Sequence, residues 1–123
     1  MNTMLWILQW ILAATFATSG TAKSIMTKER MIQTGQTGVA PFPLWVIRTV
    51  AALEIAAAFG LILPWLTGMA RILTPLAAAG LALVMVGAAI SHWSLREYKQ
   101  VFGVNLVLFV MLAIVIVGRC YEL

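Results

Sequence analysis

Four long blocks of apolar residues dominate the chain, at residues 1–22, 44–63, 72–95 and 100–118. Three of them contain no Asp, Glu, Lys or Arg, and the second is interrupted only by Arg48 and Glu54. A helix of about 20 residues crosses the hydrocarbon core of a bilayer, and it satisfies its own backbone polar groups in lipid. The pattern therefore predicts an all-α polytopic membrane protein. We expect one domain over residues 1–123, a bundle of four transmembrane helices at about 3–21, 44–63, 71–92 and 101–119.

Proline and glycine residues mark the predicted boundaries. Pro41 and Pro43 precede the second helix, Pro64 is expected to end it, and Gly68 lies in the next turn. The one long connection, residues 22–43, begins with a charged half that favours a short interfacial helix. Its Gly-rich second half is typical of a mobile loop.

Composition excludes several classes of protein. Hydrophobic residues make up 63% of the chain and charged residues 10%, against about 25% charged in ordinary soluble domains, so a soluble enzyme is excluded. Cys120 and His92 are the only cysteine and histidine, which excludes a disulfide framework and a structural zinc site. The first block lacks the basic start of a signal peptide and exceeds its usual apolar length, so retention as a helix is favoured over cleavage. Membrane lipid is the expected surrounding, and no nucleic-acid partner is expected.

Loop charge predicts an orientation. The connections at residues 22–43 and 92–100 hold five basic residues: Lys23, Lys28, Arg30, Arg96 and Lys99. The other side holds Arg71 and Arg119. Basic loops favour the cytoplasm, so both termini are expected outside, in what we take to be a bacterial cytoplasmic membrane. Aromatic residues fit the same layers as interfacial anchors, with Trp6 and Trp65 on the outer side.

The most informative residue is Glu54, which lies ten residues into its helix, close to the bilayer midplane. A charge at that depth costs at least about 2.5 kcal/mol, so Glu54 should face the bundle and be paired or protonated. A lysine side chain reaches only about 6 Å, so we expect Lys23 not to touch Glu54 without a bridging molecule. Gln9 or Thr15 of the first helix could be its hydrogen-bond partner instead.

Four more polar residues are expected toward one end of the bundle, each from a different helix: Lys23, Arg48, His92 and Asn105. Together with Glu54 they predict a ligand pocket with a basic mouth and an acidic floor. Each also has a plainer interpretation. Lys23 and Arg48 could extend to lipid phosphate, which we favour for Arg48, His92 could be interfacial, and Asn105 could join two helices.

These residues also carry a resemblance to a family. The chain resembles the DoxX-like membrane proteins in the following segments: Ser19-Gly-Thr-Ala-Lys23, Glu54-Ile-Ala-Ala-Ala-Phe-Gly-Leu-Ile-Leu-Pro64, Leu73-Thr-Pro-Leu-Ala-Ala-Ala-Gly80, His92, Asn105 and Gly118-Arg119. The resemblance implies a four-helix membrane fold. The family name comes from a small subunit of a thiosulfate:quinone oxidoreductase, and a distant animal relative resembles an assembly chaperone for receptors.

Three functions are consistent with these residues. The chain has no cysteine pair, no second histidine for haem and no phosphate-binding glycine loop, so an enzyme acting alone is not favoured. The first hypothesis is an accessory or binding subunit with a lipophile site around Glu54, for which a quinone is the candidate cofactor and a membrane redox enzyme the candidate partner. The second is an assembly factor for another membrane protein. The third is a small transporter that oligomerises.

A row of small residues on the second helix suggests a contact with another copy. Ala52, Ala56 and Gly60 are spaced by four residues, and the row is expected to point away from the Glu54 face. Such rows let helices approach closely, although alanine is so common in membrane helices that chance explains the row equally well.

Overall fold

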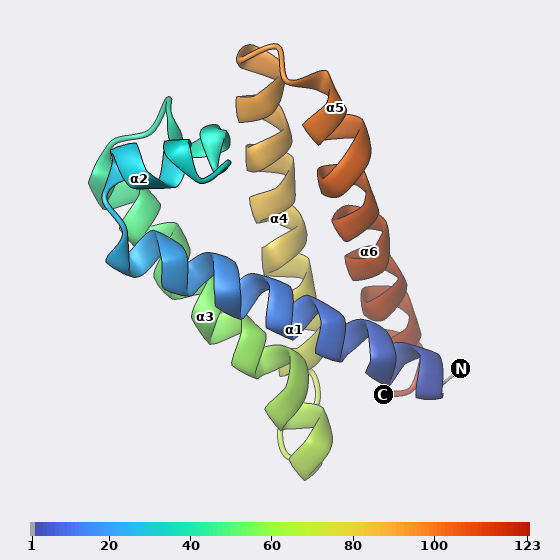
Figure 1. Ribbon diagram of the computed structural model, residues 1–123. Helices are drawn as coiled ribbons and strands as arrows, with labels where there is room; N and C mark the ends of the chain where they lie inside the picture. The colour runs from blue at the N-terminus through green and yellow to red at the C-terminus, as the bar shows by residue number, and fades with distance from the viewer. Residues whose placement is uncertain (1) are drawn as a thin grey trace.

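The structure is a computed structural model that describes residues 2–123, and the part it describes is helical (Figure 1). Its four long helices are each long and apolar enough to cross a membrane. They are α1 (Asn2–Ile25), α3 (Leu44–Thr67), α4 (Leu73–Ser94) and a final span made of α5 (Tyr98–Gln100), the π-helical turn η2 (Val101–Asn105) and α6 (Leu106–Tyr121). The all-α, four-helix prediction is confirmed.

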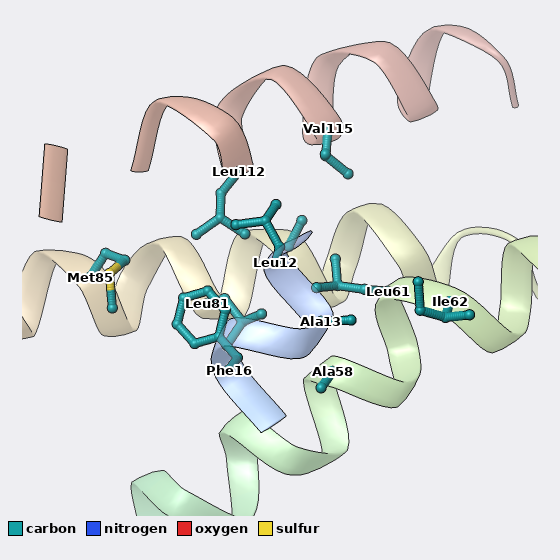
Figure 2. Close-up of a cluster of buried hydrophobic side chains, with 11 residues drawn as sticks. Leu12, Ala13, Phe16, Ala58, Leu61, Ile62, Leu81, Met85, Leu112 and Val115 are labelled. Carbon is teal, nitrogen blue, oxygen red and sulfur yellow. The ribbon is translucent and has the colours of Figure 1, made fainter. Parts of the chain in front are cut away.

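The helices pack as two connected pairs. Helix α1 packs against α3 and crosses it obliquely, whereas α4 lies beside α6 and also contacts α3 (Figure 1). Side chains from all four meet in one apolar core (Figure 2). Its buried members include Leu12 and Phe16 of α1, Leu61 of α3, Leu81 of α4 and Leu112 of α6. This core fixes the relative positions of the polar residues described below.

The outer surface is apolar as well. Leu83 is 74% exposed and Trp45 is 72% exposed, and many other large hydrophobic side chains point outward. A surface of this kind requires lipid as its solvent. The chain is therefore an integral membrane protein.

Helix α3 does not end at Pro64, contrary to the sequence prediction. It continues to Thr67 and is closed by Gly68 in the left-handed conformation, with φ 75°. Pro64 has no N–H for the carbonyl of Gly60, four residues earlier. The hydroxyl of Thr74 in α4 donates to that carbonyl at 2.9 Å. The neighbouring helix thus replaces the bond that proline removes, and the helix can continue.

The connection between α1 and α3 is more ordered than expected. A short helix α2 (Lys28–Gln33) forms in its charged half, with Thr27 as its N-cap. The Gly-rich half, expected to be mobile, contains the 3₁₀ helix η1 (Thr37–Val39). Met31 and Val39 are buried against Ile47 of α3, so the segment has a small apolar core of its own.

The small-residue row of α3 is divided between two environments. Ala52 and Ala56 are exposed, as expected for an outward face. Gly60 instead faces α4, because a Cβ atom placed on it would lie 2.9 Å from Cβ of Ala77. Only the first two residues of the row are available to another copy.

Candidate functional site

The central feature of the site is an ion pair inside the membrane-spanning region. Nζ of Lys23 in α1 lies 2.5 Å from Oε1 of Glu54 in α3. The side chain of Glu54 is 0% exposed and that of Lys23 is 16% exposed. The second carboxylate oxygen, Oε2, is buried and has no hydrogen-bond partner among residues 2–123. The expectation that Lys23 would not reach Glu54 is wrong, as is the alternative that Gln9 or Thr15 would bond to it.

The pair forms because α1 and α3 approach very closely at Gly20. A Cβ atom on Gly20 would lie 2.9 Å from the carbonyl oxygen of Ala51 and 3.3 Å from Cβ of Glu54. Lys23 follows Gly20 by three residues, so both lie on the same face of α1. The separation of Lys23 and Glu54 could not be estimated from their depths in the membrane, because α1 extends to Ile25 and crosses α3 obliquely (Figure 1).

Arg48 contacts the end of α1 and not the lipid surface. Its NH1 donates to the carbonyl of Lys23 at 2.7 Å, and its NH2 donates to the carbonyl of Met26 at 3.0 Å. These carbonyls lie at a helix C-terminus, where partners within the helix run out and a positive charge is favourable. The preferred interpretation of Arg48, an extension to lipid phosphate, is wrong. Arg48 holds the backbone that carries Lys23.

His92 belongs to a different contact, at the end of α4. Its Nδ1 lies 2.8 Å from Oε1 of Glu97, whose Oε2 accepts from the hydroxyl of Thr37 at 2.6 Å. Ser91 donates to the carbonyl of Gly38. The hydrogen bonds from Thr37 and then from His92 lower the pKa of the Glu97 carboxyl below its ordinary value. This cluster attaches η1 to α4, so the structure does not join His92 to the Lys23–Glu54 pair.

Asn105 is buried between α4 and the start of α6. Its Nδ2 lies 3.6 Å from Sδ of Met85, and it ends the π-helical turn. With Met85 and Phe102 it lines an open groove of about 300 Å³ between the two helices. Asn105 therefore links helices at a second location, in line with its plainer interpretation.

A second buried polar network was not predicted, and Arg119 is its centre. The guanidinium is 0% exposed, and it donates through Nε to Gln9 at 2.6 Å and through NH1 to Asn2 and Glu122 at 2.7 and 2.8 Å. Gln9 in turn donates to the carbonyl of Leu61 at 2.6 Å. The network joins α1, α3 and α6 near the two chain ends.

Two tryptophans enclose Arg119. The guanidinium carbon lies 4.5 Å from the ring centre of Trp65 and 5.3 Å from that of Trp6. Cation–π contacts of this kind, and the burial of Trp65, go beyond the interfacial anchoring expected for both residues. A polar Gln9 inside an apolar helix was the available signal, since it needs a partner at its own depth.

The chemistry of the Lys23–Glu54 pair is that of an adjacent donor and acceptor in apolar surroundings. An ammonium group has three N–H donors and a carboxylate has two acceptor oxygens, and the pair uses one of each. Within residues 2–123 no group of three or more His, Cys, Asp or Glu side chains is placed to hold a metal ion. The free donors and the unpartnered Oε2 can bind a polar group that both accepts and donates hydrogen bonds.

Fold and site together define a small four-helix integral membrane protein with a buried ion pair between its first two long helices. The DoxX-like family matches residues 7–115 of the chain. The chain belongs to this family. No curated protein and no solved structure matches it.

Proposed function

We propose that the protein is a membrane accessory protein that binds a lipophile with a polar head group at the Lys23–Glu54 pair, and that a quinone is the class of lipophile bound. One observation carries the proposal: Oε2 of Glu54 is fully buried and unpartnered among residues 2–123, beside an ammonium group with unused donors. Buried polar atoms are normally satisfied, so an unpartnered carboxylate oxygen is a candidate ligand contact.

The energetics of buried ion pairs support a role beyond folding. Removing two charges from water costs several kcal/mol per ion, and their attraction often only balances this loss. Apolar residues of similar volume would stabilise the bundle equally well. The pair is therefore better explained by what it binds than by the stability that it adds.

A quinone head group fits the donors and acceptors of the pair. A quinone carbonyl accepts a hydrogen bond, which Lys23 can donate, and a quinol hydroxyl donates one, which Oε2 of Glu54 can accept. Lys23 is the partly exposed member, so it is the group that an incoming head group meets first. The chain itself supplies binding and orientation, and a membrane redox enzyme as partner would supply the electrons.

The proposal is tested by titrating the purified protein in lipid nanodiscs with a short-chain benzoquinone. We expect saturable one-to-one binding. The double variant Lys23→Gln/Glu54→Gln removes both charges without leaving one unpaired, and it should weaken binding about ten-fold to a hundred-fold, as loss of a hydrogen bond to a charged group predicts. The control Lys99→Gln/Glu29→Gln changes two exposed residues and should bind as the wild type does. Equal affinity in both double variants, or no saturable binding, contradicts the proposal.

We further propose the orientation in which residues 22–43 and 92–100 face the cytoplasm of a bacterial cell and the termini lie outside. Basic residues held inside a polar network should not count toward loop charge. Setting aside Lys23, paired with Glu54, and Arg119, buried with Gln9, leaves Lys28, Arg30, Arg96 and Lys99 against Arg71. The excess of basic residues in the connections at 22–43 and 92–100 is therefore retained, and it favours a cytoplasmic location for them.

A further inference from the structure

A long apolar groove runs along the outer face of α6. It has a volume of about 650 Å³, within the usual range of about 300–1,000 Å³ for small-molecule sites. Phe109, Ala113 and Val117 lie along it, and Tyr121 and Glu122 lie at its end. A groove of this composition on a membrane-spanning helix suits a hydrocarbon chain.

The groove ends at the Arg119 network. Glu122 lines the groove, and its Oε2 also accepts from NH1 of Arg119 at 2.8 Å. The other terminal nitrogen of Arg119, NH2, is buried and has no hydrogen-bond partner among residues 2–123. An unsatisfied N–H group on a fully buried guanidinium indicates a missing acceptor.

The charge at this end of the bundle favours an anion. The guanidinium carbons of Arg71 and Arg119 lie 5.2 and 4.5 Å from the ring centre of the same tryptophan, Trp65. Both arginines therefore contact the same indole ring, and Glu122 is the acidic side chain bonded to Arg119. The carboxyl groups of Glu54 and Glu97 are engaged elsewhere, with Lys23 and His92.

We propose that one anionic phospholipid binds here, with an acyl chain in the α6 groove and its phosphate on Arg119 and Arg71. Arginine matches phosphate well because its planar guanidinium donates two parallel hydrogen bonds. The phosphate takes the place of the Glu122 carboxylate, which is 33% exposed. The apolar groove selects a lipid over free phosphate. This site is separate from the Lys23–Glu54 pair, which uses other residues.

The test is native mass spectrometry of the protein released from mixed phosphatidylglycerol and phosphatidylcholine vesicles. We expect one phosphatidylglycerol retained per chain, with retention reduced about ten-fold to a hundred-fold in Arg71→Gln, as loss of a charged hydrogen bond predicts. Ala113→Phe fills the groove and should reduce retention as strongly. Val107→Phe adds the same ring to an exposed position of α6 outside the groove, and it should retain lipid normally.

Other outcomes overturn the proposal. Equal retention of phosphatidylcholine would show that the arginines select no anion. Retention of inorganic phosphate by both Ala113→Phe and the wild type would show an anion site without a lipid chain. Unchanged lipid retention in Ala113→Phe would show that no acyl chain lies in the groove. A lipid-free dimer that Ala113→Phe dissociates would show that a second copy of the chain occupies it. Arg71 is exposed, so its substitution tests the charge without removing the buried Arg119.

Discussion

Nζ of Lys23 lies 2.5 Å from Oε1 of Glu54 because Gly20, one helical turn earlier, lets α1 touch the backbone of α3. A glycine thus sets the distance between two charged side chains from different helices. Loss of that close approach should separate the charges inside an apolar bundle.

Gly20→Ala should destabilise the protein by about 1–3 kcal/mol, the usual range for overpacking a filled core. The added methyl would lie 2.7 Å from Cγ1 of Ile55 and 2.9 Å from a backbone oxygen. Gly80→Ala in α4 is the matched control, since a Cβ atom there meets nothing within 4 Å. Thermal unfolding in detergent should show a lower midpoint for the first variant alone. Equal midpoints for the two variants would show that the close approach of α1 and α3 at Gly20 does not contribute to stability.

Replacing one member of the Lys23–Glu54 ion pair should destabilise the protein more than replacing both. Lys23→Met leaves the buried Glu54 without its cation partner, and it should destabilise the fold by about 3–5 kcal/mol. The double variant Lys23→Met/Glu54→Gln removes both charges and should recover most of that loss. Unfolding free energies of the single and double variants measure this difference. Additive losses would show that the two side chains do not interact.

Pro64 and Thr74 should be energetically coupled through the carbonyl of Gly60. Thr74→Val leaves that carbonyl without its 2.9 Å hydrogen bond and should destabilise the protein by about 1–3 kcal/mol. In a Pro64→Ala background the backbone N–H is restored, so the same substitution should have a much smaller effect. A double-mutant cycle checks this coupling. Thr49→Val, which alters an exposed hydroxyl bonded within its own helix, should show none.

Attachment of η1 to α4 should weaken in acid. The pKa of Glu97 is lowered from an ordinary value of 4.5, first by the hydrogen bond from Thr37 and then by that from His92. A carboxyl with a lowered pKa stabilises the folded state above its unfolded value, and this contribution is lost as the pH falls through the folded value. Hydrogen exchange in residues 37–40 should therefore be faster in Glu97→Gln than in the wild type at pH 7. The two proteins should converge only as the pH falls through the lowered pKa of Glu97, below 4.5.

Glu29→Gln is the control for that experiment, because Glu29 is exposed on α2. It should exchange as the wild type does at every pH. A difference between Glu97→Gln and the wild type that persists unchanged in strong acid would contradict the role of the ionised carboxylate.

The proposed orientation predicts the accessibility of Gln36, in the connection between α2 and η1. In a Cys120→Ser background, Gln36→Cys should resist a membrane-impermeant thiol reagent added to intact cells and react after lysis. A reporter fused after Leu123 that is active only in the cytoplasm should stay inactive. Labelling of Gln36→Cys in intact cells would show the opposite orientation.

The class of fold and the location of the spans follow from the residue pattern alone. An apolar block of about 20 residues must form a helix to cross lipid, and this requirement is local to each block. Glu54 was recognisable for the same reason, because a charge at midplane depth is costly whatever surrounds it. The family resemblance at Gly20, Glu54 and Pro64 also came from the sequence, and the family match confirms it.

Which polar side chains meet depends on how the helices pack against one another. Because α1 crosses α3 obliquely, Lys23 reaches Glu54, and the first turns of α1 bring Gln9 within hydrogen-bond distance of Arg119. Neither contact follows from counting residues along separate helices. The extension of α3 past Pro64 also depended on a hydroxyl from α4. Side-chain pairing between helices depends on crossing angle and closest approach, and small residues such as Gly20 set these only once both packing faces are known.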